Sequence, residues 1–284
     1  MTEYEICWIP LPKTNLEQHF QTVERPRRRN SRVGAAPKAF DPQPPRAFSY
    51  SVRQPDANKE SKRAAALEAV QNVESGMTVG LGTGSTAALA IEELGRLQNT
   101  GALQCDYCAT SYQSMQLARE AGLRVFPVES FDSLDVSIDG ADEVDPALNL
   151  IKGGGAAHTL EKIVHSLSSK FVCVIDGSKL VTTLGERTPV PLEILPQAIN
   201  VVRHELDRLG AREVSLRMAL RKDGPVITDH GNFVLDVRFD SFHAEAMEKE
   251  LNSISGVVEN GIFARCRPAF VIVGESSGVR RLEG

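Results

Sequence analysis

Short apolar runs alternate with amphipathic patterns between residues 66 and 175, and this alternation restricts the fold more than any other feature of the sequence. The apolar runs predict strands at residues 77–81, 103–109, 123–126, 134–138 and 171–175. The amphipathic patterns predict helices at residues 87–97, 111–121 and 158–167. A chain in which strands alternate with helices is expected to form an α/β fold, with a mostly parallel sheet and helices on both faces.

A further helix is predicted before the first strand. Ala66, Leu67, Val70 and Val73 recur at helical spacing, and Gly76 is placed to cap the C-terminal end of this helix. We therefore expect the ordered part of the chain to begin near residue 56.

The pattern changes after Pro189, where a second domain is expected to begin. Helices are predicted at residues 196–209 and 242–254, and strands at residues 212–217, 232–238 and 256–259. Helices set against neighbouring strands indicate a smaller α+β domain over residues 190–262. A last buried strand at residues 268–273 is expected to return to the first, Rossmann-like domain, which then comprises residues 56–189 and 263–284.

Residues 1–55 differ in composition from the rest, and we expect them to form a disordered extension. They contain eight of the fifteen prolines, one of the twenty-two glycines and a net charge of +4. Four glutamates are atypical of a transit peptide, and this stretch lacks the apolar core of a signal peptide. Its prolines also argue against the paired helices of a DNA-binding helix-turn-helix.

The composition is typical of a soluble globular protein, with 42% hydrophobic and 24% charged residues. We expect no membrane partner, because no apolar run approaches the ~20 residues that span a bilayer. We expect no nucleic-acid partner, because the net charge is −5. Five cysteines, an odd number, indicate free thiols in a reducing compartment. A strand would turn Cys105 and Cys108 to opposite faces, so we expect neither metal nor redox use of this pair.

A glycine-rich segment after the strand at residues 77–81 is suited to bind phosphate. Thr83, Gly84, Ser85 and Thr86 precede a helix, where backbone N–H groups and hydroxyls can surround an anion. The segment lacks the spacing of a dinucleotide-binding motif and the lysine of a P-loop. The alternative is a tight turn in which Ser85 only caps the helix, and we favour phosphate binding.

Acidic residues follow the strand at residues 134–138. Asp139 and Asp142 are expected at its C-terminal end, which is the edge where open α/β sheets bind ligands. Either aspartate could instead cap the following turn. Glu143 and Asp145 are expected to be solvated turn residues.

A lysine and a glutamate flank a second glycine-rich segment. Lys152 precedes Gly153, Gly154 and Gly155, and Glu161 lies near the start of the helix at residues 158–167. Glycines let the backbone adopt positive φ and approach a small polar ligand closely. A cation, a carboxylate base and nearby acids are suited to moving protons on an anionic small molecule.

Two further observations bear on this site. His158, Glu161 and His165 share one helix face, which would suit a metal ion. We expect no metal there, because zinc needs another suitable ligand or an open position with supporting partners. Lys179 follows the strand at residues 171–175, so we expect it at the same sheet edge rather than as a solvated loop lysine.

Taken in order, these segments resemble the type A ribose-5-phosphate isomerases over residues 56–284. The matching segments are Gly82-Thr83-Gly84-Ser85-Thr86, Asp139-Gly140-Ala141-Asp142-Glu143, Lys152-Gly153-Gly154-Gly155-Ala156-Ala157 with Glu161-Lys162, and Ser178-Lys179. Weaker matches are Pro189-Val190-Pro191-Leu192-Glu193 and Thr228-Asp229-His230-Gly231-Asn232. The ordered set is more specific than any one glycine-rich loop.

The resemblance implies an aldose-ketose isomerase that interconverts D-ribose 5-phosphate and D-ribulose 5-phosphate in the non-oxidative pentose phosphate pathway. Glu161 would be the base that moves a proton between C1 and C2 through an enediolate. Lys152 and the loop amides would stabilise the oxyanion, and Asp139 would assist ring opening. The family resemblance also implies a cytoplasmic homodimer that needs no metal and no organic cofactor.

The resemblance further implies a substrate site built from the matching loops. The phosphate would contact Thr83, Gly84, Ser85, Thr86 and Lys179, with Lys62 as a weaker match. The sugar would contact Asp139, Gly140, Ala141, Asp142, Lys152, Gly153, Gly154 and Gly155. Residues 1–55 have no counterpart in the family, and His158 and Leu160 depart from its pattern, which bears on substrate positioning.

Two other classes of function are alternatives. A sugar-phosphate-sensing module would bind the ligand without chemistry, would carry a DNA-binding segment and would not need Glu161. A CoA transferase-like enzyme would use Glu161 as a nucleophile and would need a CoA pocket. Thermal-shift titrations with ribose 5-phosphate and with CoA separate these alternatives from an isomerase.

Overall fold

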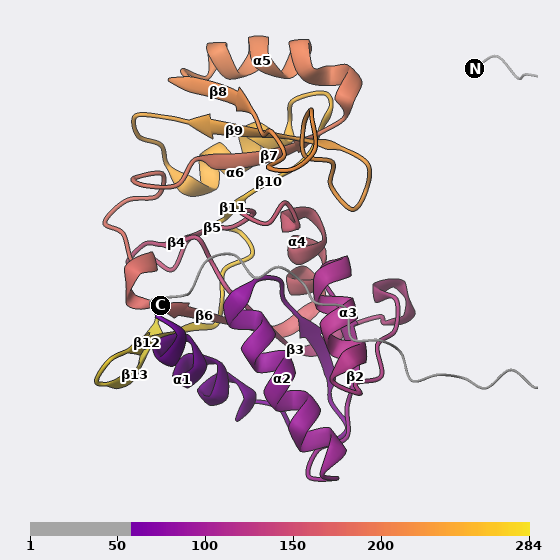
Figure 1. Ribbon diagram of the computed structural model, residues 1–284. Helices are drawn as coiled ribbons and strands as arrows, with labels where there is room; N and C mark the ends of the chain where they lie inside the picture. The colour runs from indigo at the N-terminus through magenta and orange to yellow at the C-terminus, as the bar shows by residue number, and fades with distance from the viewer. Residues whose placement is uncertain (1–57) are drawn as a thin grey trace, which may run out of the picture. The chain divides into compact units, whose positions relative to one another are not determined.

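The computed structural model describes residues 58–284, and its largest sheet is the six-stranded one in the lower part of Figure 1. The strand order is β13-β12-β6-β3-β1-β2. The strands are β1 (Thr78–Leu81), β2 (Asp106–Ala109), β3 (Leu134–Asp139), β6 (Ser168–Asp176), β12 (Phe270–Glu275) and β13 (Gly278–Glu283). All neighbours pair in parallel except β12 and β13. The prediction of a mostly parallel sheet is therefore confirmed, and the prediction for residues 1–55 lies outside the described residues.

Helices cover both faces of this sheet, as predicted. On one face lie α1 (Lys59–Val70), α2 (Ser85–Asn99) and α3 (Tyr112–Glu120), and on the other lies α4 (His158–Leu167). Side chains of β6 point alternately to the two faces of the sheet. Val172 and Val174 pack in the core with α1 and α2, whereas Phe171 and Cys173 pack in the core on the opposite face. A Cβ at Gly80 would lie 2.5 Å from Val164 Cγ1, so the absence of a side chain at Gly80 lets α4 approach β1.

Two antiparallel sheets complete the described residues. A small sheet contains β4 (Glu143–Val144), β5 (Leu150–Ile151) and β11 (Ile262–Phe263). A four-stranded sheet contains β10 (Val257–Asn260), β7 (Val190–Ile194), β9 (Phe233–Arg238) and β8 (Glu213–Leu216), in that order. Helices α5 (Ile199–Arg208) and α6 (Ala244–Asn252) pack with it around a second apolar core. Three short 3₁₀ helices are η1 (Val128–Ser130), η2 (Gly177–Lys179) and η3 (Pro196–Ala198).

Two local predictions were wrong. Residues 123–126 form no strand but one isolated bridge from Val125 to Tyr107, and Pro127 then removes the N–H that would continue the pairing. Helix α1 ends at Val70, so Gly76 does not cap it and lies in a later turn with φ of +94°. The sequence reading also missed β4, β5, β7, β11 and β13. Strands β4, β5 and β11 have two residues each and β13 lies at an edge, whereas β7 lies inside the four-stranded sheet and was hidden by the prolines around it.

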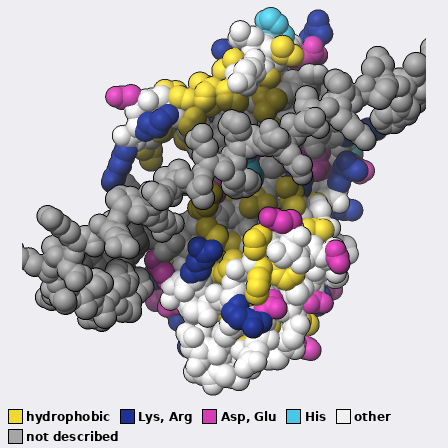
Figure 2. All heavy atoms as spheres, turned by 90° about the vertical axis from the view of Figure 1, so that its right-hand side faces the viewer, with side chains coloured by type: hydrophobic (Ala, Val, Ile, Leu, Met, Phe, Trp, Pro, Cys, Tyr) yellow, Lys and Arg dark blue, Asp and Glu magenta, His cyan; other side chains and the backbone are white. Residues whose placement is uncertain are grey.

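The structure shows where the cysteines and the charged side chains of the surface lie. Cys105 and Cys108 are free thiols buried in two different apolar clusters. On the face drawn in Figure 2, acidic and basic side chains are interspersed among the described residues. Among residues 58–284, no helix has the length and apolar character needed to cross a membrane.

Candidate active site

Asp139 ends β3 and is completely buried, with two donors on each carboxylate oxygen. Oδ1 accepts from the backbone N–H groups of Thr83 at 3.0 Å and Gly140 at 2.7 Å. Oδ2 lies 2.9 Å from Lys152 Nζ and 3.0 Å from His165 Nε2. Burial opposes ionisation, but Lys152 and His165 outweigh it and hold the pKa of Asp139 below its usual range. Asp139 is therefore a fixed, ionised carboxylate.

The backbone around Asp139 leaves no space for another side chain. A Cβ at Gly82 would lie 2.1 Å from Asp139 Oδ1, so glycine is required where the predicted phosphate-binding segment passes β3. This close approach joins the two loops that the sequence placed at one sheet edge.

Lys152 follows β5 and lies between two carboxylates. Its ammonium is 2.9 Å from Asp139 Oδ2 and 3.3 Å from Glu161 Oε2, and it donates to the carbonyl of Gly140. Burial favours the neutral amine, but the two acids outweigh this effect and raise the pKa of Lys152. Lys152 is therefore a buried, permanent cation. Its side chain and that of Glu161, nine positions later, point to the same place.

Glu161 lies in the first turn of α4 and has the properties of a proton acceptor. It is 4% exposed, and its Oε2 atom lacks an aligned hydrogen bond despite the nearby Lys152 ammonium. Burial, helped by the charge of Asp139 and opposed by Lys152, raises the pKa of Glu161 to about 8. A carboxylate with this pKa is a much stronger base than a solvated one.

The second glycine-rich loop lies directly beside these groups. Gly153 has φ of +107° and Ala156 has φ of +60°. The N–H of Gly154 donates to Asp142 Oδ2 at 2.8 Å, which attaches the half-buried Asp142 to the loop. Arg217, which the sequence reading missed, donates from Nη1 to the carbonyl of Gly153 at 2.8 Å. Its guanidinium also pairs with Asp236, so the four-stranded sheet holds the loop.

The predicted phosphate-binding segment forms the N-terminal end of α2. Gly84 has φ of +106° and precedes the first turn, which begins with the exposed Ser85 and the buried Thr86. Lys62 Nζ on α1 donates to Ser85 Oγ at 3.2 Å. A basic side chain therefore lies beside backbone N–H groups, an arrangement suited to an anion.

The remaining predicted contacts lie near this segment. Lys62 Nζ is also 3.8 Å from Asp176 Oδ2, and Asp176 accepts from the backbone N–H of Ser178 in η2. Lys179 is the next residue of η2, but its ammonium has no hydrogen bond or ion pair with residues 58–284. The structure thus joins Lys62 directly to the segment and brings Lys179 only to the neighbouring turn.

Comparisons with known proteins agree with this geometry. A family model described as ribose 5-phosphate isomerase A (phosphoriboisomerase A) matches residues 107–278. Ribose-5-phosphate isomerase A of Thermosynechococcus vestitus is 52% identical over 222 residues, which cover 78% of this chain and 93% of that protein. The protein of the same name from Methanothermobacter thermautotrophicus is also 52% identical, with 78% and 96% covered. The chain belongs to the ribose 5-phosphate isomerase A family.

Solved structures of ribose 5-phosphate isomerases share the fold. The isomerase A of Methanocaldococcus jannaschii superimposes with a TM-score of 0.77 at 44% identity, covering 80% of this chain and 100% of that one. A D-ribose-5-phosphate isomerase in complex with phospho-erythronic acid has a TM-score of 0.77 at 46% identity, covering 80% and 99%.

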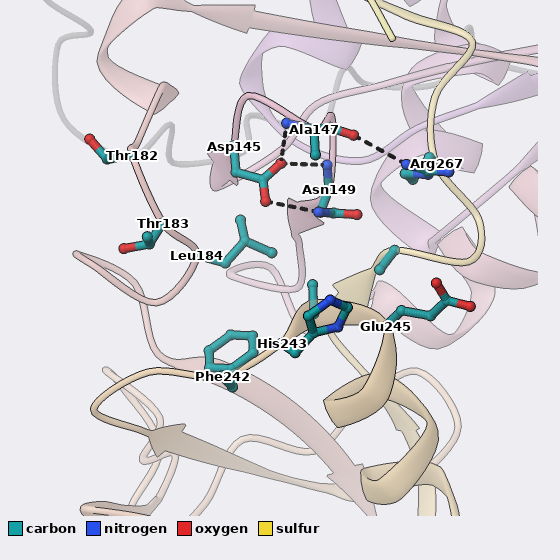
Figure 3. A pocket seen from close by; sticks show the side chains of 12 residues that line it. Asp145, Ala147, Asn149, Thr182, Thr183, Leu184, Phe242, His243, Glu245 and Arg267 are labelled. Carbon is teal, nitrogen blue, oxygen red and sulfur yellow. Dashed lines mark hydrogen bonds between the residues drawn. The ribbon is translucent and has the colours of Figure 1, made fainter.

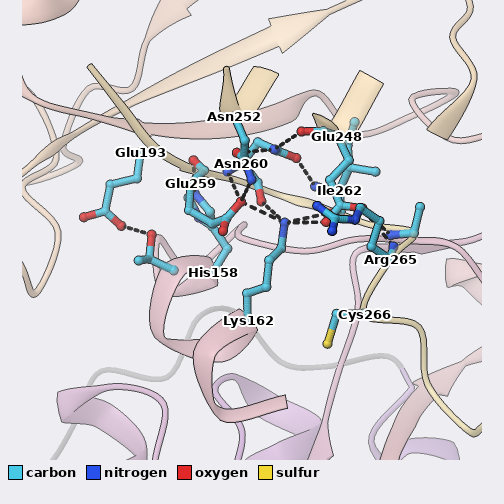
Figure 4. A network of polar contacts seen from close by, with 12 residues as sticks. His158, Lys162, Glu193, Glu248, Asn252, Glu259, Asn260, Ile262, Arg265 and Cys266 are labelled. Carbon is cyan, nitrogen blue, oxygen red and sulfur yellow. Dashed lines mark hydrogen bonds and ion pairs between the residues drawn. The ribbon is translucent and has the colours of Figure 1, made fainter. Parts of the chain in front are cut away.

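In this member of the isomerase A family, a polar network joins α4 to α6 and β10 (Figure 4). Lys162, the residue after Glu161, donates to Glu248 at 3.0 Å and to Glu259 at 2.9 Å. It also donates to the carbonyls of Asn260 and Ile262. Because the network is buried and its members are paired, it holds the helix that carries Glu161 in one position.

Glu143 is not the solvated turn residue that the sequence suggested. Its side chain is buried and accepts from the backbone N–H groups of Gly185, Arg187 and Thr188. The N–H groups come from a loop about forty residues away, so local sequence could not reveal them. Asp145 does lie in a turn and accepts from Ala147 and Asn149.

The three side chains that share one face of α4, those of His158, Glu161 and His165, contact different groups. His158 Nε2 lies 3.3 Å from the carbonyl of Glu259, whereas His165 binds Asp139 and Glu161 faces Lys152. No group of three or more His, Cys, Asp or Glu side chains among residues 58–284 is arranged to hold a metal ion.

A hollow lies among other residues than those of the candidate site (Figure 3). It has a volume of about 360 Å³, and its lining includes Asp145, Thr183, Phe242, His243 and Arg267. None of the ionic residues that surround Lys152 lines it.

Proposed function

We propose that this protein interconverts D-ribose 5-phosphate and D-ribulose 5-phosphate as an aldose-ketose isomerase of the non-oxidative pentose phosphate pathway. The observation that carries this proposal is the buried contact of Glu161 with Lys152, 3.3 Å apart beside the glycine-rich loop. Membership of the family and the solved relative in complex with phospho-erythronic acid support the substrate class.

In the proposed mechanism, Glu161 takes the proton from C2 of the open-chain aldose and delivers it to C1. The hydrogen next to a carbonyl is weakly acidic, so the enediolate between these steps must be stabilised. We assign stabilisation of the charge on the enediolate oxygens to Lys152 and to backbone N–H groups of the 153–155 loop other than that of Gly154, which donates to Asp142. The proton that leaves C2 is returned to C1, and the hydroxyl proton of O2 passes to O1, so the atoms balance within the substrate and the reaction needs no oxidant or cofactor.

We assign Asp139 a supporting part in this mechanism. Because four donors hold it ionised and buried, it is a weak proton acceptor, and ring opening is a less suitable role for it. Asp139 instead keeps Lys152 charged and placed next to Glu161. Asp142, half-buried beside Gly154, is the acid that can reach substrate hydroxyls.

We place the phosphate at the start of α2, with Thr83, Gly84, Ser85 and Thr86. The N–H groups of the helix terminus and the Lys62 ammonium support this choice. Lys179 would add charge from the neighbouring turn.

The decisive experiment is an assay of ribulose 5-phosphate formation by the purified protein, with a metal chelator present. We expect turnover that the chelator does not change. Absence of turnover with ribose 5-phosphate, in protein shown to be folded by circular dichroism, would reject the proposal.

The raised pKa of Glu161 predicts the pH dependence of catalysis. Because the base must be ionised, kcat/KM is expected to rise with pH and to level off above about pH 8. The measurement is kcat/KM at constant ionic strength between about pH 6 and about pH 10. A profile already flat at about pH 6 would show that burial does not raise the pKa of the base.

We also propose a cytoplasmic homodimer with the two domains given by the sequence, over residues 56–189 with 263–284 and over residues 190–262. Exposed apolar side chains between β8 and β9, including Met218 and Leu220, support self-association.

Four free cysteines in the described residues support a reducing compartment. Light scattering would give the mass, and cell fractionation the location.

A further inference from the structure

His165 is a buried side chain that the mechanism above does not use, although it contacts Asp139 directly. It lies on α4, one turn after Glu161. Its Nε2 atom is 3.0 Å from Asp139 Oδ2, and its Nδ1 atom is 3.0 Å from Ser137 Oγ. The ring stacks on Phe171 with a centroid distance of 3.9 Å and an interplanar angle of 6°.

These contacts determine which nitrogen carries the hydrogen. The Asp139 carboxylate can only accept, so Nε2–H donates to it, and Nδ1 accepts from the Ser137 hydroxyl. Burial lowers the pKa of His165, which keeps the ring neutral. The charged groups that face the ring are Asp139 on β3 and Lys152 after β5. From β6 and β11 the ring meets the side chains of Phe171 and Phe263.

The His165 N–H and the Lys152 ammonium share one oxygen of Asp139. Without the N–H, Oδ2 would have Lys152 as its remaining donor and would attract the ammonium more strongly. Lys152 would then move toward Asp139 and away from Glu161. We therefore expect the position of the cation to depend on a side chain whose own hydrogen bonds go to Ser137 and Asp139.

We propose that His165, oriented by Ser137, is a positioning residue that sets how close the Lys152 ammonium lies to Asp139 and to Glu161. This inference rests on the proposed isomerase function and goes beyond it by adding two residues that are buried behind Asp139. Ser137, His165, Asp139, Lys152 and Glu161 then form one continuous chain of polar contacts into the site.

The test compares the double variant His165→Leu/Ser137→Ala with the single variant His165→Gln. The double variant removes the donor without leaving an unpaired hydroxyl, and Gln retains an N–H near the position of Nε2. We expect the double variant to lose kcat by roughly 10- to 100-fold with KM nearly unchanged, because the ammonium is misplaced. The acidic limb of its kcat/KM profile is expected to move to higher pH, and His165→Gln to recover both properties in large part.

Val164→Ala is the matched control, because Val164 is equally buried on α4 but is apolar and packs on β1 and β3. It is expected to lower Tm without moving the pH profile. A double variant that only loses Tm, with kcat and the pH profile unchanged, would reduce His165 to a packing residue and overturn the inference. If the double variant does not fold, the single variant Ser137→Ala serves as the test. An unchanged pH profile of kcat/KM in that variant would equally overturn the inference about His165. Failure of the unmodified protein to isomerise the sugar phosphate would instead reject the proposed function.

Discussion

Replacing Glu161 with glutamine is expected to lower kcat by ~10²–10⁴-fold or more, while sugar-phosphate binding stays nearly intact. The amide preserves the shape of the side chain but cannot take the proton from carbon. Lys152 keeps its contact with Asp139 and so remains charged and in place. The measurement is steady-state turnover of ribose 5-phosphate, combined with calorimetric titration of a non-isomerisable phosphorylated sugar acid.

The same variant is expected to be at least as stable as the unmodified protein in alkaline solution. The pKa of Glu161 is raised in the folded state, so ionisation of this buried acid weakens the fold as pH rises from about 4.5 to about 8. A neutral amide removes this effect, and Tm at about pH 9 should be equal or higher. Below about pH 4.5 the two proteins should not differ for this reason.

Glu245→Gln is a matched control, because Glu245 also lies in the first turn of a helix but is exposed. It should change neither turnover nor the pH dependence of Tm. Normal turnover by Glu161→Gln would show that another group is the base.

Local sequence contained enough information to locate the centre of the site. Asp139 follows a short run that predicts a strand, and in a parallel sheet the ends of such strands form the ligand edge. Glu161 and Lys152 are separated by a loop whose glycines allow a tight return, and their side chains do converge. The core strands and helices were predictable for the same reason, because their apolar spacing is strong and local.

The supporting residues were not predictable, because each acts over a long sequence distance. Arg217, directly after β8, reaches the 153–155 loop, and Glu248 reaches Lys162 from α6. Glu143 was misjudged because its partners lie about forty residues away. The spacing of His165 on its helix gave no indication of Asp139, which the tertiary fold places beside it. A pattern along one helix cannot reveal what the neighbouring strand presents.

Replacing Lys152 with methionine is expected to have two large effects that can be separated. The first is a loss of kcat of roughly 10²–10³-fold with a smaller change in KM, because the enediolate charge exists mainly in the transition state. The second is a loss of stability of about 3–5 kcal/mol, because Asp139 would remain as a buried charge without its cation. Kinetic assays and urea unfolding measure the two effects.

The double variant Lys152→Met/Asp139→Asn distinguishes the electrostatic role from a purely structural one. Neutralising Asp139 removes the unpaired charge, so stability is expected to recover toward that of the unmodified protein. Activity is expected to stay low, because nothing replaces the cation beside the enediolate oxygens. If stability and activity recovered together, Lys152 would serve only to hold the fold. If stability recovered alone, the ammonium would act on the reaction itself, as its place 3.3 Å from Glu161 requires.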